Sequence, residues 1–256
     1  MSAGAPRSGA DGQESSTLAV VHPREQTMSL AGRILVVAPH ADDETLGLGG
    51  TIARRVAEGH EVHVAVVTGH GEAAHPLWPR SAWDEVRAEA RLAMAVLGVS
   101  ELHFEEVPAA LVADQPVWRL NQVLGGLVER IRPRTLYVPF PFDLHKDHRE
   151  VFHALSVAWR SSSAIGRQVR AIFCYEVQSE THWNAPYLEA AFVPNAWVDI
   201  TDHLETKLRA LACYRSQLRP APDARSLEAV RALAVWRGSQ QSMGAAEAFV
   251  AVRLLD

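Results

Sequence analysis

The chain has 256 residues, 48% of them hydrophobic, which is enough for one α/β domain with a large buried core. The formal net charge of −5 and the lack of a basic stripe argue against a nucleic-acid partner, and no apolar run could span a bilayer. Two cysteines are too few for a disulfide framework, and the N-terminus does not resemble a secretory signal. We therefore expect a cytoplasmic protein with reduced thiols and no membrane span.

The first 30 residues differ in composition from the rest of the chain. They are rich in Ser, Gly, Ala, Gln and Glu and show no sustained periodicity, which is typical of a disordered leader. Met28 lies just before the first predicted strand and could serve as a later start of translation. We expect residues 31–256 to form a single folded domain.

The stretch RILVVAPHADDETLGLGG, residues 33–50, joins a predicted strand to a predicted helix. Residues 34–38 are apolar and mostly branched, which suits a strand buried on both faces, and Pro39 ends it. A helical pattern over residues 46–58 follows and is closed by Gly59. Open α/β sheets bind their ligands in such turns after parallel strands, so the polar residues of this turn are candidates for a functional site.

Those polar residues are His40, Asp42 and Asp43. An imidazole and two carboxylates at the end of a buried strand carry a high desolvation cost, which a divalent cation would offset. Alternate residues of a turn point in different directions, so Asp42 and Asp43 need not share a task. One of them can bind a metal while the other faces a substrate.

A second cluster follows the apolar strand predicted over residues 135–140, where a helix should begin. His145 and His148 are three residues apart with Asp147 between them, a spacing that puts both imidazoles on one side of a helix start. Either cluster alone could be a solvated helix start, where Asp is a common cap. Because both clusters follow apolar strands and both mix His with Asp, we predict one shared site, with three ligands and an open position as in catalytic zinc sites.

The remaining segments alternate strands with helices, which predicts an α/β fold: a single Rossmann-like domain with a mostly parallel sheet flanked by helices. The glycines of LGLGG, residues 46–50, do not form a GxGxxG fingerprint, and we interpret them as sites of close helix packing. His60, His63 and His103 lie in or beside strands and are interpreted as surface or hydrogen-bonded histidines. Further strands are predicted at 62–68, 102–107, 171–177, 196–200 and 249–254, and further helices at 81–97, 117–131, 148–159, 202–218 and 226–236.

The motifs PHADDE, LGLGGTIA and HKDH together resemble the PIG-L/LmbE family of zinc-dependent N-acetylglucosamine deacetylases. The resemblance runs from about residue 31 to the C-terminus, so it implies that residues 31–256 are a deacetylase domain. It also implies that Zn²⁺ would be held by His40, Asp43 and His148.

The same resemblance assigns roles to the residues around the metal. Asp42 would be the general base, His145 would stabilise the oxyanion, and Asp147 would orient and charge His145. Arg87, in the helix predicted over residues 81–97, would contact the substrate, on the basis of the looser pattern RxEA…LGV. Glu247, in GAAEAF, resembles the C-terminal signature of the family, without a role that the sequence explains.

The activity implied is metal-assisted hydrolysis of an acetamide on a small N-acetylated amino sugar, which releases acetate and a free amine. Two alternatives stay open: a metal-dependent amidase or phosphoesterase on another small substrate, and a metal-stabilised binding protein without turnover. Two-metal phosphoesterases normally need more carboxylates than these clusters provide, and a binding protein would not need Asp42. The group attached to the sugar and the formation of a homo-oligomer are left open by the sequence.

Overall fold

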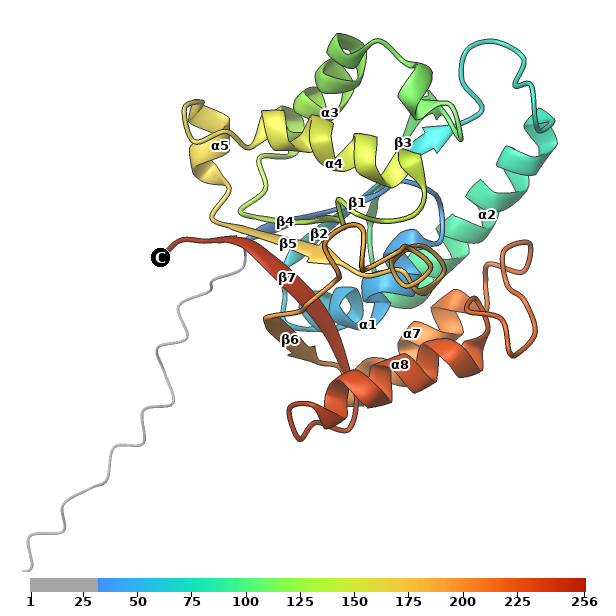
Figure 1. Ribbon diagram of the computed structural model, residues 1–256, viewed down its shortest axis with the longest axis vertical. Helices are drawn as coiled ribbons and strands as arrows, with labels where there is room; N and C mark the ends of the chain where they lie inside the picture. Colours follow the sequence, from blue (N-terminus) through green and yellow to red (C-terminus); the bar gives the residue numbers. More distant parts are fainter. Residues whose placement is uncertain (1–31) are drawn as a thin grey trace, which may run out of the picture. The chain divides into compact units, whose positions relative to one another are not determined.

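A seven-stranded sheet lies at the centre of the structure, a computed structural model that describes residues 32–256 (Figure 1). The strand order is β3-β2-β1-β4-β5-β7-β6, with β1 to β5 parallel and β7 antiparallel to both of its neighbours. The predicted leader, residues 1–30, and Met28 lie outside the described residues. The strands are β1 Arg33–Ala38, β2 Glu61–Gly69, β3 Glu101–Pro108, β4 Thr135–Pro139, β5 Ala171–Tyr175, β6 Ala196–Asp199 and β7 Ala246–Leu254.

Helices cover both faces of the sheet and bury two separate apolar cores. One core packs α1, α2, α7 and α8 against one face, and the other packs α3 and α4 against the opposite face. Strand β1 contributes alternate residues to each core, and this is why its sequence is continuously apolar rather than alternating. The α-helices are α1 Asp43–Ala57, α2 Arg80–Leu97, α3 Val117–Ile131, α4 Lys146–Ala158, α5 Ala164–Gln168, α6 Gln178–Thr181, α7 Leu204–Leu211 and α8 Leu227–Ser239, with short 3₁₀ turns at Val112–Asp114 and Thr201–His203.

The predicted fold class is confirmed: this is a single α/β domain with a mostly parallel sheet between helices. The helix predicted over residues 202–218 is wrong at its C-terminal end, because α7 stops at Leu211. Tyr214 is fully buried there, and its hydroxyl donates a hydrogen bond to Glu44 at 2.6 Å. This tertiary contact draws the chain inward where the local pattern alone would have continued the helix.

Helix α1 is broken at Leu48, which has φ −147° and ψ 26°. Two buried side chains of opposite charge, Glu247 and Lys207, form hydrogen bonds with the peptide groups that the break leaves free. Glu247 accepts the N–H groups of Gly50 and Thr51 at 3.0 and 2.6 Å. Lys207 donates to the Leu46 carbonyl at 2.8 Å. The two side chains also meet each other at 2.6 Å. Glu247 therefore holds α1 after the break, and Lys207 holds it before the break.

The glycines of α1 permit this packing. A Cβ at Gly47 would clash with the Tyr175 ring, and one at Gly50 would lie 2.7 Å from Ile200. The interpretation of LGLGG as a close-packing motif is thus confirmed.

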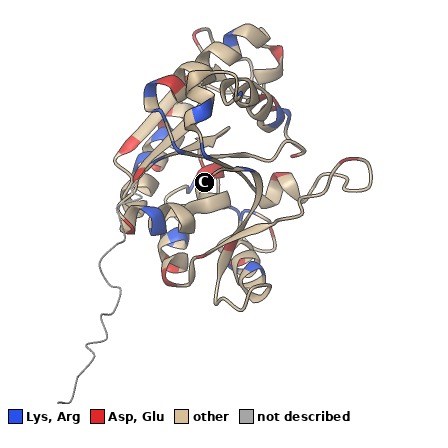
Figure 2. Ribbon diagram, turned by 90° about the vertical axis from the view of Figure 1, so that its left-hand side faces the viewer, with Lys and Arg blue, Asp and Glu red and all other residues tan. Residues whose placement is uncertain are grey.

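Charged residues of both signs are interspersed over the described elements, as Figure 2 shows. Within residues 32–256, no helix combines the length and the apolar character that crossing a membrane requires. Cys174 is buried, Cys213 is half-buried, and both thiols are free.

Candidate metal centre and active site

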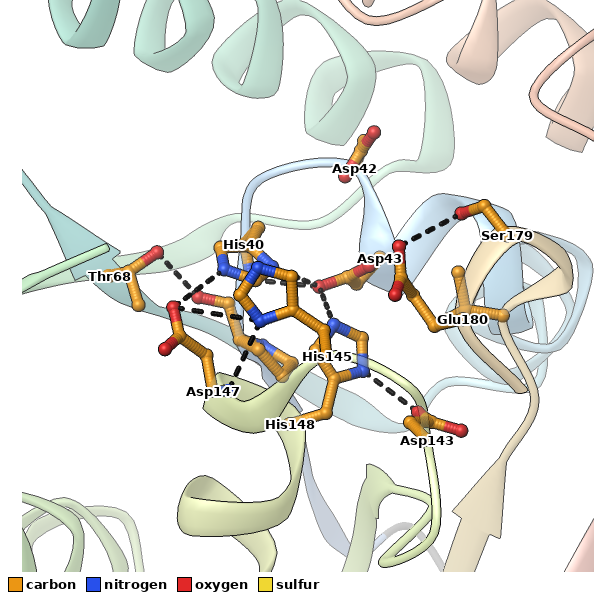
Figure 3. Close-up of polar contacts among 12 residues, drawn as sticks. His40, Asp42, Asp43, Thr68, Asp143, His145, Asp147, His148, Ser179 and Glu180 are labelled. Atoms are coloured by element: carbon orange, nitrogen blue, oxygen red, sulfur yellow. Dashed lines mark hydrogen bonds and ion pairs between the residues drawn. The ribbon is translucent and has the colours of Figure 1, made fainter. Parts of the chain in front are cut away.

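The two predicted clusters meet at the carboxyl ends of β1 and β4, which are neighbours in the sheet (Figure 3). His40 follows β1, Asp43 is the first residue of α1, and His148 lies in the first turn of α4. They meet because the carboxyl ends of adjacent parallel strands open on the same edge of a sheet.

Asp43 lies at the centre of this cluster. Its Oδ2 is 3.3 Å from His40 Nδ1 and 3.1 Å from His148 Nε2. Both Asp43 and His148 are fully buried, yet within residues 32–256 neither Asp43 Oδ1 nor His148 Nε2 has a partner in hydrogen-bonding geometry. Tetrahedral zinc with ligands at about 2.0–2.2 Å would separate their donor atoms by about 3.3–3.6 Å, close to the spacing of these donors. The donor set therefore fits a divalent metal.

The imidazoles of His148 and His40 each have a second carboxylate at the ring nitrogen that faces away from Asp43. His148 Nδ1 lies 2.8 Å from Asp143 Oδ2, and Asp143 Oδ1 accepts the Thr181 hydroxyl at 2.6 Å. His40 Nε2 lies 3.0 Å from Asp147 Oδ2. A carboxylate only accepts, so these contacts place a proton on the outer nitrogen of each ring and turn the other nitrogen toward Asp43.

The ionisable groups of the cluster shift one another's pKa values. Burial lowers the pKa of His40, but hydrogen bonds with Asp147 and Asp43 outweigh burial and raise that pKa to about 9. Burial likewise disfavours the charged form of His148, but Asp43 and Asp143 raise its pKa well above the usual value. In return, the pKa of Asp43 is lowered well below its ordinary value, because the two imidazoles outweigh its burial. A metal would replace those protons.

Asp42 lies beside the cluster but outside it. Its backbone has φ 126°, in a region that side chains rarely adopt, and its N–H donates to Glu44 Oε2 at 3.2 Å. The carboxylate is buried, with Arg225 as its ion-pair partner at 3.5 Å. Burial raises the pKa of Asp42 to about 8, and Arg225 partly opposes this rise. The strained backbone separates this side chain from that of its neighbour Asp43.

Asp147, predicted to pair with His145, has a nearer partner in His40. The Asp147 carboxylate is 4.0 Å from His145 Nδ1, too far for a hydrogen bond, and it accepts instead from His40 and from the N–H of Ala110 at 2.6 Å. His145 is the N-cap of α4, and its Nδ1 accepts the backbone N–H of Asp147 at 3.1 Å. Burial and the charge of His40 lower the pKa of His145 to about 4, so the ring is neutral with its proton on Nε2.

A cavity of about 400 Å³ opens onto this cluster. Its walls include an aromatic side, in which Trp78 meets Trp83 edge to face, and a polar side formed by the segment after α7. A larger hollow, of about 850 Å³, lies between α7 and α8 and contains none of the cluster residues, so the smaller cavity is the candidate active site. Its lining includes His40, Asp42, His145, Trp78, Arg219 and Arg225.

Arg87 does not line this cavity. Its guanidinium pairs with Glu106 at 2.5 Å and lies 5.0 Å from the centre of the Phe104 ring. The expected substrate contact of Arg87 therefore has no support in the cavity, where Arg219 and Arg225 are the arginines present. The helix that carries Arg87 is present as predicted, and a role of this residue in substrate binding stays a prediction.

A third group of metal-ligand residue types, His63, Glu101 and His103, lies near the amino ends of β2 and β3. His63 Nδ1 is 3.1 Å from His103 Nε2, the rings are nearly parallel at 10°, and Glu61 lies 2.9 Å from His63 Nε2. These histidines satisfy one another by hydrogen bonds. The interpretation of His63 and His103 as hydrogen-bonded histidines is thus confirmed.

Sequence reasoning missed Asp143, Glu44 and Arg225. Asp143 stands two residues before His145 in PFDLHKDH, so its spacing from the histidines was a usable signal. Glu44 lies within the PHADDE motif. Arg225 is far along the chain, in a segment without a motif, and only the fold brings it to Asp42.

Comparison with known proteins agrees with this geometry. The family described as PIG-L: GlcNAc-PI de-N-acetylase matches residues 35–159, which include both clusters. A 1D-myo-inositol 2-acetamido-2-deoxy-alpha-D-glucopyranoside deacetylase of Actinosynnema mirum is 28% identical over 238 residues, covering 75% of this chain and 83% of the relative. A diacetylchitobiose deacetylase of Thermococcus kodakarensis is 26% identical over 200 residues, covering 72% of this chain and 70% of the relative.

The fold has solved counterparts as well. The N,N'-diacetylchitobiose deacetylase from Pyrococcus horikoshii, at 22% identity, superposes with a TM-score of 0.69 and covers 89% of this chain and 86% of its own. The superposition shows a shared fold, and in sequence the chain is similar to the PIG-L family and to deacetylases of N-acetylglucosamine-containing substrates.

Proposed function

We propose that this protein is a zinc-dependent deacetylase that removes the acetyl group from a substrate containing N-acetylglucosamine. The observation that carries the proposal is a pair of buried atoms that could bind a metal, Asp43 Oδ1 and His148 Nε2. Neither has a hydrogen-bond partner within residues 32–256, and their cluster opens onto a cavity. The relatives reported above are deacetylases of N-acetylated amino sugars, which supports the reaction class.

In this proposal His40, Asp43 and His148 hold the ion. Two imidazoles and one carboxylate suit zinc, and three protein ligands leave a position free, as in catalytic sites. Bound there, zinc would polarise the acetamide carbonyl and lower the pKa of a water molecule to about 7.

Asp42 is the proposed general base. It is buried at the edge of the cavity and separate from the ligand atoms, and burial raises its pKa to about 8. A carboxylate with a raised pKa can accept the proton of the attacking water near neutral pH and then give it to the leaving amine. Arg225 faces the Asp42 carboxylate, and Glu44 accepts the backbone N–H of Asp42.

His145 is the proposed oxyanion donor, acting as a neutral imidazole. Its Nδ1 is engaged by the backbone of α4, so its Nε2 carries the proton that it can donate in the cavity. A neutral donor needs no partner to charge it, which replaces the role first expected of Asp147. One oxyanion donor contributes about 2.7–4 kcal/mol in comparable sites.

The substrate end of the cavity suits a sugar. Trp78 is 43% exposed although it packs against His75 and Trp83, so one aromatic surface is available for stacking. A cytoplasmic location, a substrate that is a small N-acetylated amino sugar, and residues 31–256 as the deacetylase domain are parts of the same proposal.

The test is acetate release from a panel of N-acetylglucosamine conjugates by metal-stripped protein with and without added Zn²⁺. An acetanilide and a phosphate ester serve as probes of the amidase and phosphoesterase alternatives. The proposal predicts zinc-dependent acetate release from the sugar conjugates in the wild type and none in Asp42→Asn. Zinc-dependent cleavage of the phosphate ester alone would overturn it.

A further inference from the structure

Two guanidinium groups, those of Arg219 and Arg225, line the polar side of the active-site cavity. Both belong to the segment between α7 and α8, and the same cavity is lined by Trp78 and Trp83. The local partners of the two arginines differ, and that difference indicates what each can bind.

Arg225 has acidic partners within the protein. Its Nη1 is 3.5 Å from Asp42 Oδ2, its Nη2 is 3.7 Å from Glu180 Oε1, and its Nε donates to Ser179 Oγ at 3.2 Å. Two carboxylates thus face one guanidinium. The Arg225 guanidinium is therefore already engaged by groups of the protein itself.

Arg219 lacks such a partner. Its Nη1 donates to the carbonyls of Ser216 and Leu218 at 3.2 and 3.0 Å, and these bonds fix the side chain over its own loop. Within residues 32–256, no carboxylate lies within ion-pair distance of it, and Nη2 and Nε make no hydrogen bond. A positioned guanidinium with two free donors is a ready partner for a carboxylate or a phosphate.

We propose that Arg219 binds an anionic group, a carboxylate or a phosphate, on the part of the substrate attached to the N-acetylated sugar. This inference rests on the proposed deacetylase function and adds the substrate class: anionic conjugates are preferred over neutral ones. Arg219 is a specificity residue and takes no part in the chemistry at the acetamide.

The experiment compares two glycosides of N-acetylglucosamine that differ in charge: the carboxymethyl glycoside, and the carbamoylmethyl glycoside, which is its neutral amide. N-acetylglucosamine 1-phosphate provides the phosphate arm. Acetate release is measured with the zinc-loaded wild type, with Arg219→Gln, and with Arg215→Gln as a matched control, because Arg215 is exposed on the same segment and does not line the cavity. Binding of each compound to the same proteins is measured by calorimetry.

The wild type should show a lower KM for the anionic glycoside than for its amide, and Arg219→Gln should remove about a fivefold preference, since partly exposed ion pairs contribute about 1 kcal/mol. The kcat should stay unchanged, and added salt should weaken the binding of the anionic substrate but not that of the amide. Equal KM values for the two glycosides in the wild type, or a preference that survives in Arg219→Gln, would overturn the inference. If no glycoside is deacetylated, the proposed function fails, and the calorimetric preference for the anion still decides the role of Arg219.

Discussion

Asp42 and Asp43 are adjacent in the chain, yet their surroundings push them to opposite behaviour. Asp43 faces two imidazoles that lower its pKa well below the ordinary value, whereas burial raises the pKa of Asp42 to about 8. The residue with the low pKa suits a metal ligand, and the residue with the raised pKa suits a group that carries a proton. The unusual φ of 126° at Asp42 lets one turn present both.

The first prediction separates these two roles. Asp42→Asn should reduce kcat roughly 100- to 10,000-fold and leave zinc content unchanged, because a base acts only in proton transfer. Asp43→Asn should lose zinc. Metal content by plasma mass spectrometry and acetate release are measured on both, with Asp84→Asn, an exposed site on α2, as the control. Loss of metal in Asp42→Asn with retention in Asp43→Asn would reverse the assignment.

The second prediction concerns Asp147, whose carboxylate supports His40. Asp147→Asn should weaken zinc binding about 10- to 100-fold, the usual cost of removing a carboxylate behind a metal-binding histidine. Zinc affinity is measured by competition with a chelator, beside the pH profile of kcat/KM. If zinc affinity were unchanged and the alkaline limb of the profile moved to lower pH, Asp147 would act through His145 after all.

The site was predictable where potential metal ligands directly follow an apolar strand in the sequence. His40, Asp42, Asp43 and His148 follow apolar strands, so their meeting at one sheet edge could be inferred. The partner of Asp147 could not, because it depends on which way the carboxylate points from the first turn of α4.

At the scale of elements, α1 depends on two distant segments. Lys207 of α7 and Glu247 of β7 form hydrogen bonds with the backbone on either side of the break at Leu48. The first turn of the same helix carries Asp43. The element with the catalytic turn is therefore held by the C-terminal part of the chain. This gives Glu247 the structural role that its sequence signature did not reveal.

The third prediction tests this support. Glu247→Ala should lower the free energy of unfolding by about 3–5 kcal/mol, because it leaves the Lys207 ammonium buried without its partner. Glu58→Gln, which breaks a half-exposed pair on the same helix, should cost about 1 kcal/mol or less. Urea denaturation measures both. Equal, small effects of the two substitutions would show that the buried pair is dispensable.

Element bounds were predictable where local signals agree. Helix α3 occupies the predicted residues 117–131, because Pro116 precedes it, Pro133 follows it, and its apolar face recurs at Leu120 and Leu124. The four-residue helix α6 was not predicted, because four residues are too few to show a helical periodicity of hydrophobic residues. It nevertheless brings Glu180 and Thr181 to the site.

At the scale of the whole molecule, metal binding and folding stability should be linked through protons. In the metal-free protein the pKa of His40 is raised from 6.5 to about 9, and the pKa of His148 is raised well above 6.5. A histidine whose pKa is raised by folding stabilises the protein fully below its unfolded pKa, and this contribution is lost as pH rises through the folded pKa. Asp42, with its pKa raised to about 8, adds an effect of the same sign.

The last prediction follows from this sign. Metal-free protein should lose stability as pH rises from 6.5 to about 9, the window set by His40. Zinc binding requires neutral imidazoles, so it must displace those protons and should tighten over the same window. The rise in Tm on adding saturating Zn²⁺ should therefore be larger near pH 9 than near pH 6.5, and calorimetry in buffers of different ionisation enthalpy should register proton release on binding. In His148→Ala the Tm should not respond to zinc at either pH. A zinc-induced rise in Tm that is equal at both ends of the window, without proton release, would mean that His40 and His148 are not the groups that zinc engages.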